Sequence, residues 1–222
     1  MTTLIALALL LQDSEFKCAD GYALKYALTA PEKIEDGKKY PLALCLHGRG
    51  GNSTAAKVLA RDEMKKKYPC FILAPSVNRD YSWSGGMGKA ALPCVFELVD
   101  DLMKKHPIDA DRVYVTGQSM GGYGTFGALA SRPDFFAAAA PVCGGGKPAD
   151  ASKHKAVPIW VFHGADDPTV PVERSREMVK ALKDAGAEPK YDEYPGVKHN
   201  SWDKAYGTPE LWTWMFEQVR KK

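Results

Sequence analysis

The chain has 222 residues, of which 45% are hydrophobic and 26% are charged, and its formal net charge is +3. This length and composition suit one globular α/β domain with a substantial buried core. The excess of positive charge is small and evenly scattered, which excludes nucleic acid as the expected partner.

An unbroken apolar run occupies residues 4–11. It is too short to span a bilayer, so we expect no stable membrane insertion. Its length suits the apolar part of a signal peptide, although no Lys or Arg precedes it and no small-x-small cleavage site follows it. We favour a short signal-like segment at residues 1–12 and a single domain at 13–222, in an exported, periplasmic or secreted protein. The alternative is a buried first segment in a cytoplasmic protein.

The five cysteines do not decide between these locations, because their number is odd. Cys45 and Cys70 fall at apolar, strand-like positions, where a reduced thiol behaves as a small hydrophobic side chain. No C-x-x-C pair or Cys/His cluster has the spacing of metal ligands, so we expect no metal site.

The sequence predicts an antiparallel hairpin, turned at Asp20-Gly21, and then strands that alternate with helices. In chain order the expected elements are the hairpin at 17–30, strand 42–46, helix 54–67, strand 70–74, helix 90–106, strand 113–115, helix 120–131, strands 135–142 and 159–162, helix 173–185, strand 191–194 and helix 211–219. Continuous apolar runs such as L-A-L-C-L are typical of parallel strands buried on both faces. The pattern predicts a mostly parallel, doubly wound α/β sheet with helices on both sides.

The strand at 113–115 runs into G-Q-S-M-G at 117–121, and a predicted helix follows. A serine at such a strand-to-helix turn has a strained backbone, and its hydroxyl is pushed clear of the sheet. Side chains at Gly117 and Gly121 would collide across so tight a turn. Ser119 is therefore the candidate nucleophile, provided that suitable partners follow other strands.

A serine nucleophile needs a base, and the base needs a carboxylate to orient it. In a doubly wound sheet these groups are expected after the carboxyl ends of strands. Asp166 and Asp167 both follow the strand at 159–162. We favour Asp167 because a proline-bounded turn follows it, and we interpret Asp166 as a turn or capping residue.

Five histidines compete for the role of base. Four have another interpretation. His47 and His163 would support loops after strands, His106 would be a cation at a helix end, and His154 would belong to a polar loop. His199, just after the last short strand, is the candidate base. The chain order Ser119, Asp167, His199 is that of α/β-hydrolases and differs from the trypsin-like and subtilisin-like orders.

An oxyanion needs two backbone N–H donors. Met120 follows the nucleophile at a helix N-terminus, where the helix dipole also favours negative charge. The second donor is expected in H-G-R-G-G-N at 47–52, with Arg49 as the candidate. A phosphate-binding loop is excluded because neither G-x-x-x-x-G-K-[ST] nor G-x-G-x-x-G occurs.

Three motifs, L-C-L-H-G-R-G-G-N, H-P-I-D-A-D-R-V-Y-V-T-G-Q-S-M-G-G-Y-G-T and F-H-G-A-D-D-P-T-V-P, resemble small esterases of the α/β-hydrolase superfamily. The most similar groups are the phospholipase/carboxylesterase family, the "predicted peptidase" branch, and the feruloyl-esterase and polyhydroxybutyrate-depolymerase-like enzymes. The resemblance covers roughly residues 40–215. It implies an α/β-hydrolase fold that acts on small-molecule carboxylic esters without a cofactor.

By the same resemblance, Ser119 is the nucleophile, Asp167 the acid and His199 the base of a two-step acyl transfer. Arg49 and Met120 supply the oxyanion N–H groups. Dienelactone hydrolases share this fold but use cysteine as the nucleophile, which Ser119 argues against.

Lids in this superfamily usually lie between the strand after the nucleophile helix and the strand that precedes the acid. Here the interval is only about residues 144–157, so we expect no cap domain and an open site. Trp83, together with Tyr81, and Trp202 are candidate substrate contacts, with ordinary loop packing as the alternative for each. Gln118 is a further candidate, unless it serves only as scaffolding of the turn.

Two other functions remain open. A serine peptidase would use the same three residues but would need to recognise a peptide backbone. A non-catalytic binding module could keep the fold. The presence of all three residues argues against it, because loss of any one of them would suffice to end catalysis. We expect a serine carboxylesterase for small, aryl or carbohydrate-linked esters.

Overall fold

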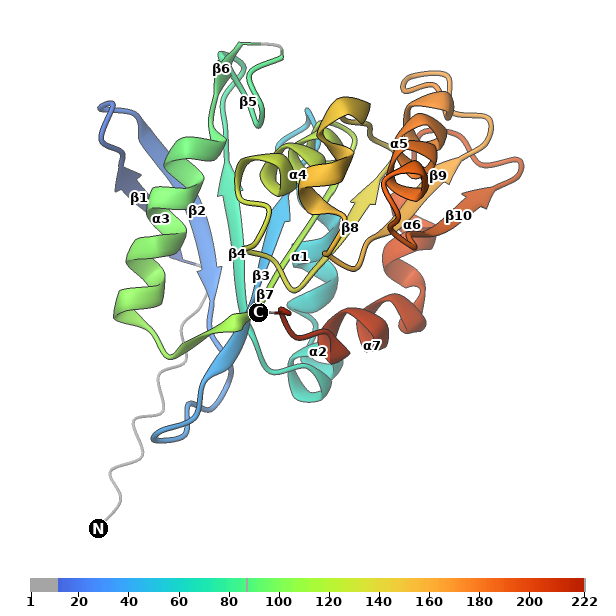
Figure 1. The fold of residues 1–222 in the computed structure, drawn as a ribbon. Helices are drawn as coiled ribbons and strands as arrows, with labels where there is room; N and C mark the ends of the chain where they lie inside the picture. Colours follow the sequence, from blue (N-terminus) through green and yellow to red (C-terminus); the bar gives the residue numbers. More distant parts are fainter. Residues whose placement is uncertain (1–11, 87, 222) are drawn as a thin grey trace.

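The centre of the fold is an eight-stranded sheet with the strand order β1-β2-β4-β3-β7-β8-β9-β10 (Figure 1). The computed structural model describes residues 12–86 and 88–221. The strands of the sheet are β1 Gln12–Lys17, β2 Ala23–Thr29, β3 Tyr40–Leu46, β4 Phe71–Ser76, β7 Ile108–Gln118, β8 Ala138–Val142, β9 Trp160–Gly164 and β10 Lys190–Tyr194. The pairs β1-β2 and β2-β4 are antiparallel, and the other neighbours are parallel. The predicted mostly parallel sheet with an N-terminal antiparallel hairpin is confirmed.

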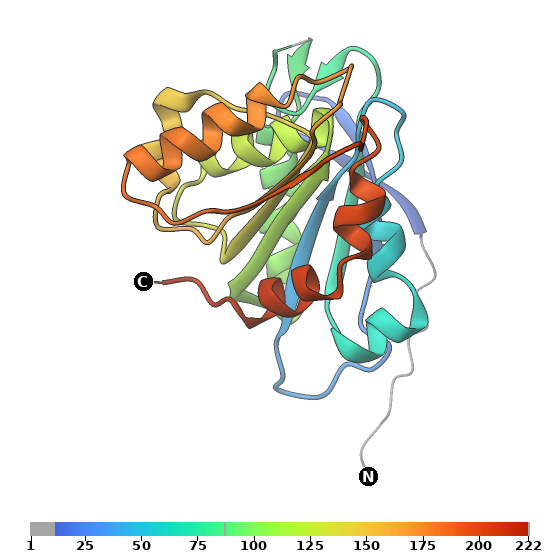
Figure 2. The same ribbon diagram turned by 90° about the vertical axis from the view of Figure 1, so that its right-hand side faces the viewer.

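Helices cover both faces of this sheet (Figure 2). One face carries α3 Leu92–Lys105, α4 Met120–Ser131 and α5 Glu173–Asp184, and the other carries α1 Thr54–Leu59, α6 Trp202–Gly207 and α7 Pro209–Glu217. Strand β3 shows why two covered faces are needed, since all seven of its residues are buried. Its Leu42, Leu44 and Leu46 belong to the first hydrophobic cluster, whereas Ala43 and Cys45 belong to the second. Each face of a strand needs such a cover, because successive side chains point to opposite faces.

Several element boundaries differ from the sequence prediction. The helix expected at 54–67 is two helices, α1 and α2 Asp62–Lys67, which are separated at Ala60 and Arg61. Strand β4 continues through Pro75 to Ser76, where its remaining partner is β2. Helix α6 was not predicted as a separate element. The last helix, expected at 211–219, ends at Glu217, and Val219 is 57% exposed.

A disulfide between Cys18 and Cys94 joins the β1-β2 turn to the start of α3, and the two Cα atoms are 5.4 Å apart. Cys45, Cys70 and Cys143 are buried free thiols. The prediction that Cys45 and Cys70 are reduced core residues is confirmed.

The predicted signal-like segment at 1–12 lies almost entirely outside the described residues. Gln12 is the exception, since it opens β1 and pairs with Leu28 of β2. Among the described residues, no helix is long and apolar enough to cross a membrane.

Between β8 and β9 the described chain contains one short 3-10 helix, η1 Pro148–His154, which packs against α4 and α5. The predicted absence of a cap domain therefore holds for this interval. A second, two-stranded sheet, β5 Tyr81–Ser82 with β6 Lys89–Ala90, lies in the segment between β4 and α3.

Candidate active site

The turn between β7 and α4 places Ser119 in a strained backbone conformation, with φ 56° and ψ −117°. Such a positive φ is rare for residues other than glycine. The two flanking glycines are required by close backbone packing. A Cβ at Gly121 would overlap the carbonyl oxygen of Leu46, and a Cβ at Gly117 would lie 2.8 Å from the Cα of Gly121. The sheet and the helix thus approach each other at Ser119 as closely as the backbone allows.

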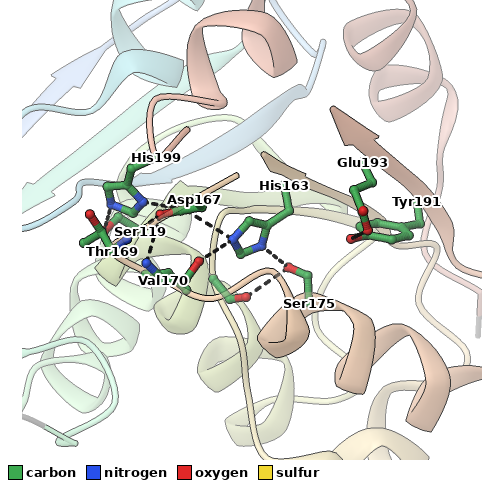
Figure 3. A network of polar contacts seen from close by, with 10 residues as sticks. Ser119, His163, Asp167, Thr169, Val170, Ser175, Tyr191, Glu193 and His199 are labelled. Atoms are coloured by element: carbon green, nitrogen blue, oxygen red, sulfur yellow. Dashed lines mark hydrogen bonds and ion pairs between the residues drawn. The ribbon is translucent and has the colours of Figure 1, made fainter. Parts of the chain in front are cut away.

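Ser119, His199 and Asp167 form one hydrogen-bonded chain (Figure 3). Oγ of Ser119 lies 2.9 Å from Nε2 of His199, and Nδ1 of His199 lies 2.7 Å from Oδ2 of Asp167. The three residues follow β7, β10 and β9, whose carboxyl ends meet at the same edge of the sheet. The structure therefore brings together the three residues that the sequence analysis selected, in the geometry that a serine nucleophile needs.

Asp167 is held in its ionised form by four donors around a buried carboxylate. Oδ1 accepts from the N–H groups of Thr169 at 2.8 Å and Val170 at 2.9 Å, and Oδ2 accepts from His199. Burial by itself would raise the pKa of this carboxyl group. The hydrogen bonds from His199, Val170 and Thr169 outweigh burial and hold the pKa below its ordinary value. The fourth donor, Nε2 of His163, lies 3.3 Å from Oδ2.

The neighbouring Asp166 has a different environment, because its side chain is exposed. Its backbone N–H donates to the carbonyl of Val197, which ties the acid-bearing loop to the loop that carries His199. Gly164 makes this approach possible, since a Cβ there would overlap the carbonyl oxygens of Val197 and Lys198. Asp166 thus acts as a turn residue, and Asp167 is the carboxylate that reaches His199.

The other histidines do not reach Ser119 within the described hydrogen bonds. His47 accepts from the N–H of Val77 through Nε2, and His163 is buried behind Asp167. Both support loops, as the sequence analysis predicted. His154 differs from the prediction, because it is 1% exposed and neither ring nitrogen has a hydrogen-bond partner. Burial lowers the pKa of His154 below its ordinary value.

The H-G-R-G-G-N loop passes directly beside the turn that carries Ser119. A Cβ at Gly48 would lie 3.5 Å from the Cβ of Ser119, so Arg49 follows a point of backbone contact with the turn. Met120 is the first residue of α4. These positions suit the N–H roles predicted for Arg49 and Met120, which remain predictions.

Gln118 links this loop to β7. Its side-chain amide donates to the Thr54 hydroxyl at 2.9 Å and to the Asn52 carbonyl at 3.2 Å, and its Oε1 accepts from the Thr54 N–H. The amide is thereby occupied, and the residue is 5% exposed. These bonds favour the scaffolding interpretation of Gln118, and its substrate contact stays a prediction.

The two tryptophan candidates occupy different environments. Trp83 is 1% exposed, and its indole N–H donates to the carbonyl of His47 at 2.9 Å. It also fills the space against α4, where a Cβ at Gly124 would meet its side chain. Trp83 therefore packs between α4 and the loop that begins at His47, and supports that loop. Trp202 is half-buried, and its ring stands edge-on to His199 with 5.2 Å between the ring centroids. Trp202 is thus the aromatic side chain beside the reactive groups.

Cys143 is a feature of this site that the sequence analysis did not identify. It follows β8 with φ 39°, and it is fully buried. Its Sγ lies within 4.8 Å of a carboxylate oxygen of Asp167 and of a ring nitrogen of His199. Burial raises the pKa of its thiol to about 12. The thiol is therefore protonated at neutral pH, which makes it a poor nucleophile and a poor metal ligand. The predicted strand at 135–142 was the only available signal, since it placed Cys143 at a carboxyl end.

The arrangement of the sheet and of these residues agrees with the comparison to protein families. The model of the dienelactone hydrolase family matches residues 82–205, which is more than half of the chain. The chain belongs to the dienelactone hydrolase family. We expected a related esterase branch instead, because dienelactone hydrolases use cysteine. The expectation that Ser119 argues against this family was wrong, because the chain matches the family model although its turn carries a serine.

Named relatives include several esterases. A solved thermostable esterase is 37% identical, with a TM-score of 0.90 over 95% of this chain and 63% of that one. Poly(3-hydroxyalkanoate) depolymerase C of Paucimonas lemoignei is 31% identical over 47% of this chain and 28% of its own length. Probable feruloyl esterase C of Aspergillus niger is 25% identical over 81% of this chain and 68% of its own. The chain thus spans less than two thirds of the first two of these proteins. The resemblance to small α/β-hydrolase esterases is confirmed.

Proposed function

We propose that this chain is a serine carboxylesterase in which Ser119, His199 and Asp167 hydrolyse carboxylic esters through an acyl-enzyme. The observation that carries the proposal is the continuous hydrogen bonding from Ser119 through His199 to Asp167. Family membership and the names of the relatives support the reaction class.

In this mechanism His199 takes the proton of Ser119 as the hydroxyl oxygen attacks the ester carbonyl carbon. The N–H groups of Arg49 and Met120 stabilise the oxyanion, a contribution worth on the order of 3 kcal/mol for each donor. The carbonyl re-forms as the ester C–O bond breaks, and His199 gives its proton to the departing alcohol. Water then attacks the acyl-enzyme by the same route and releases the acid and Ser119. Asp167 keeps His199 in the tautomer that presents an unprotonated Nε2 to Ser119.

We propose small aryl and carbohydrate-linked esters as the substrates. The edge-on contact of Trp202 with His199 supports an aromatic leaving or acyl group beside the reactive centre. The short β8-β9 interval supports an open site, which suits bulky or polymer-derived substrates. No metal and no cofactor has a part in this mechanism.

We propose that the domain at 13–222 is catalytic and acts outside the cytoplasm. The Cys18–Cys94 disulfide supports export, since disulfides persist mainly in oxidising compartments. The substrates are small-molecule esters, and nucleic acid has no part in the reaction.

The decisive test compares hydrolysis of p-nitrophenyl acetate, p-nitrophenyl butyrate, methyl ferulate and a peptide anilide by the pure protein. We expect ester turnover that the Ser119→Ala variant lacks, with little cleavage of the anilide. Preference for the anilide would favour the peptidase, and no turnover of any substrate would favour the binding module.

The choice of acid has its own matched pair. Asp167→Asn should lower kcat by roughly 10⁴-fold, because the asparagine cannot hold His199 in the required tautomer. Asp166→Asn should change kcat less than twofold, since the Asp166 side chain is exposed. Equal losses in the two variants would refute the assignment of Asp167.

A further inference from the structure

A second histidine lies behind the proposed acid. His163, near the end of β9, is fully buried, and it is enclosed by hydrogen-bonding groups on both ring nitrogens (Figure 3). Nδ1 lies 2.7 Å from Oγ of Ser175 on α5. Nε2 lies 2.9 Å from the carbonyl oxygen of Val170 and 3.3 Å from Oδ2 of Asp167.

These contacts determine where the ring proton of a neutral His163 lies. Both groups facing Nε2, a carbonyl and a carboxylate, are acceptors only, so Nε2 must carry the proton. Nδ1 is then the acceptor, and the hydroxyl of Ser175 donates to it. The carbonyl oxygen of Gly144 on the β8-β9 connection, 3.0 Å from Ser175 Oγ, is a second acceptor for the same hydroxyl, whose single proton serves one acceptor at a time. The two acceptors at Nε2 thus select the Nε2–H tautomer, and the hydroxyl of Ser175 is compatible with it because it can donate to Nδ1.

Burial favours a neutral ring at His163. Burial lowers the pKa of His163, while the Val170 carbonyl and the charge of Asp167 act in the opposite direction. Glu193, opposite His163 in the β9-β10 register, is already engaged by Arg176 at 2.9 Å and by the Tyr191 hydroxyl at 2.6 Å. His199 lies on the far side of Asp167. With His163 neutral, its ring does not compensate the negative charge of Asp167, which is left to act on His199.

We propose that His163 and Ser175 are positioning residues that complete the hydrogen bonding of Asp167, so that the working unit runs Ser119–His199–Asp167–His163–Ser175. This inference rests on the proposed ester hydrolysis. The Nε2–H of His163 binds two parts of one turn, because Val170 accepts through its carbonyl and donates its own N–H to Oδ1 of Asp167. His163 thereby fixes both oxygens of the carboxylate, one directly and one through Val170.

The consequence is a defined effect on catalysis. Without His163, the carboxylate loses a donor and the turn at 167–170 loses one of its attachments to β9. A carboxylate with fewer donors stabilises positive charge on its remaining partner more strongly. The acid side of the pH–activity profile should then move to higher pH, while a looser turn lowers kcat.

The test uses three variants of the whole chain with a p-nitrophenyl ester. His163→Leu should lower kcat by about 10-fold with KM within about twofold, and should move the acid limb of kcat/KM upward by a few tenths of a pH unit. His163→Gln, whose amide N–H can take the place of Nε2–H, should restore most of kcat and return the acid limb. Ser175→Ala should give an intermediate loss.

A measurement on the unmodified protein reports the tautomer directly and does not depend on the kinetics of the variants. With ¹⁵N-labelled histidine, NMR at pH 7.5 should show His163 as the neutral Nε2–H tautomer, identified by its absence in His163→Gln. The Nδ1–H tautomer or a charged ring would overturn the proposal, as would equal kinetics for His163→Leu and the parent protein. Ser119→Ala tests the proposed function, because that variant should lose all ester hydrolysis. Failure of this inference and failure of the proposed function are therefore distinguishable.

Discussion

Nε2 of His199 lies 2.9 Å from Oγ of Ser119, although 80 residues separate the two in the chain. Cys143 offers a second nucleophilic atom in the same region, within 4.8 Å of ligand atoms of His199 and Asp167. The two atoms differ in state, because burial raises the pKa of the thiol to about 12. The serine, hydrogen-bonded to the base, is the activated group.

We therefore expect Ser119→Ala to lower ester hydrolysis by roughly 10⁴-fold or more. Cys143→Ala should retain activity within about 10-fold, and iodoacetamide should leave the folded protein active. Steady-state kinetics with p-nitrophenyl acetate and mass spectrometry after alkylation measure both effects. Inactivation that tracks modification of Cys143 would contradict this assignment.

The packing of the nucleophile turn leads to a second prediction. Gly121→Ala should destabilise the fold by about 3 kcal/mol and reduce activity, because the added methyl group would overlap the carbonyl of Leu46. Gly207→Ala is the matched control, since a Cβ there meets nothing within 4 Å. Urea unfolding gives both free energies, and equal values for the two variants would show that the turn can relax.

The disulfide gives a third prediction. Cys18 and Cys94 close a loop of 76 residues, and cross-links of this kind typically stabilise a protein by about 2–4 kcal/mol. A reductant should lower the urea midpoint of the parent protein by a corresponding amount. A variant with serine at both positions should begin at the lower midpoint and show no response to the reductant. A response in that variant would assign the effect to another group.

The fourth prediction concerns acid stability and His154. Its folded pKa lies below the unfolded value of about 6.5, so the unfolded chain binds the proton first as the pH falls. The stability associated with neutral His154 is complete above this value and is lost as the pH falls toward the folded pKa.

His154→Phe should remove this loss and also the cost of two buried ring nitrogens without partners. We expect a gain of about 1 kcal/mol at pH 7.5 and a larger gain at pH 5. Urea unfolding at the two pH values measures both. A gain that is the same at both would show that His154 does not titrate on unfolding.

The features that the sequence predicted well share a local physical cause. The run L-A-L-C-L became the fully buried strand β3, because a strand covered on both faces needs apolar residues at every position. Ser119, Asp167 and His199 were identifiable because each follows a strand, and parallel strands bring these ends together.

The features that it missed depend on tertiary packing. Nothing local distinguishes a buried His154 from a polar loop residue, since its burial comes from α4 and α5. The role of Gln118 in holding Asn52 and Thr54 depends on a contact across more than 60 residues. The pairing of Cys18 with Cys94 likewise needs the β1-β2 turn to lie beside α3, which spacing alone does not reveal.

The contact of Gly121 with the carbonyl of Leu46 also bears on how the protein loses activity on heating. Ser119 holds its uncommon backbone angles because β3 and α4 press on the turn from both sides. The turn cannot relax by fraying, since neither element is at the end of the chain or the edge of the sheet. Relief of the strain requires β3 and α4 to separate, which belongs to cooperative opening of the whole core. Thermal inactivation should therefore coincide with global unfolding, with no earlier phase in which a folded but inactive form accumulates.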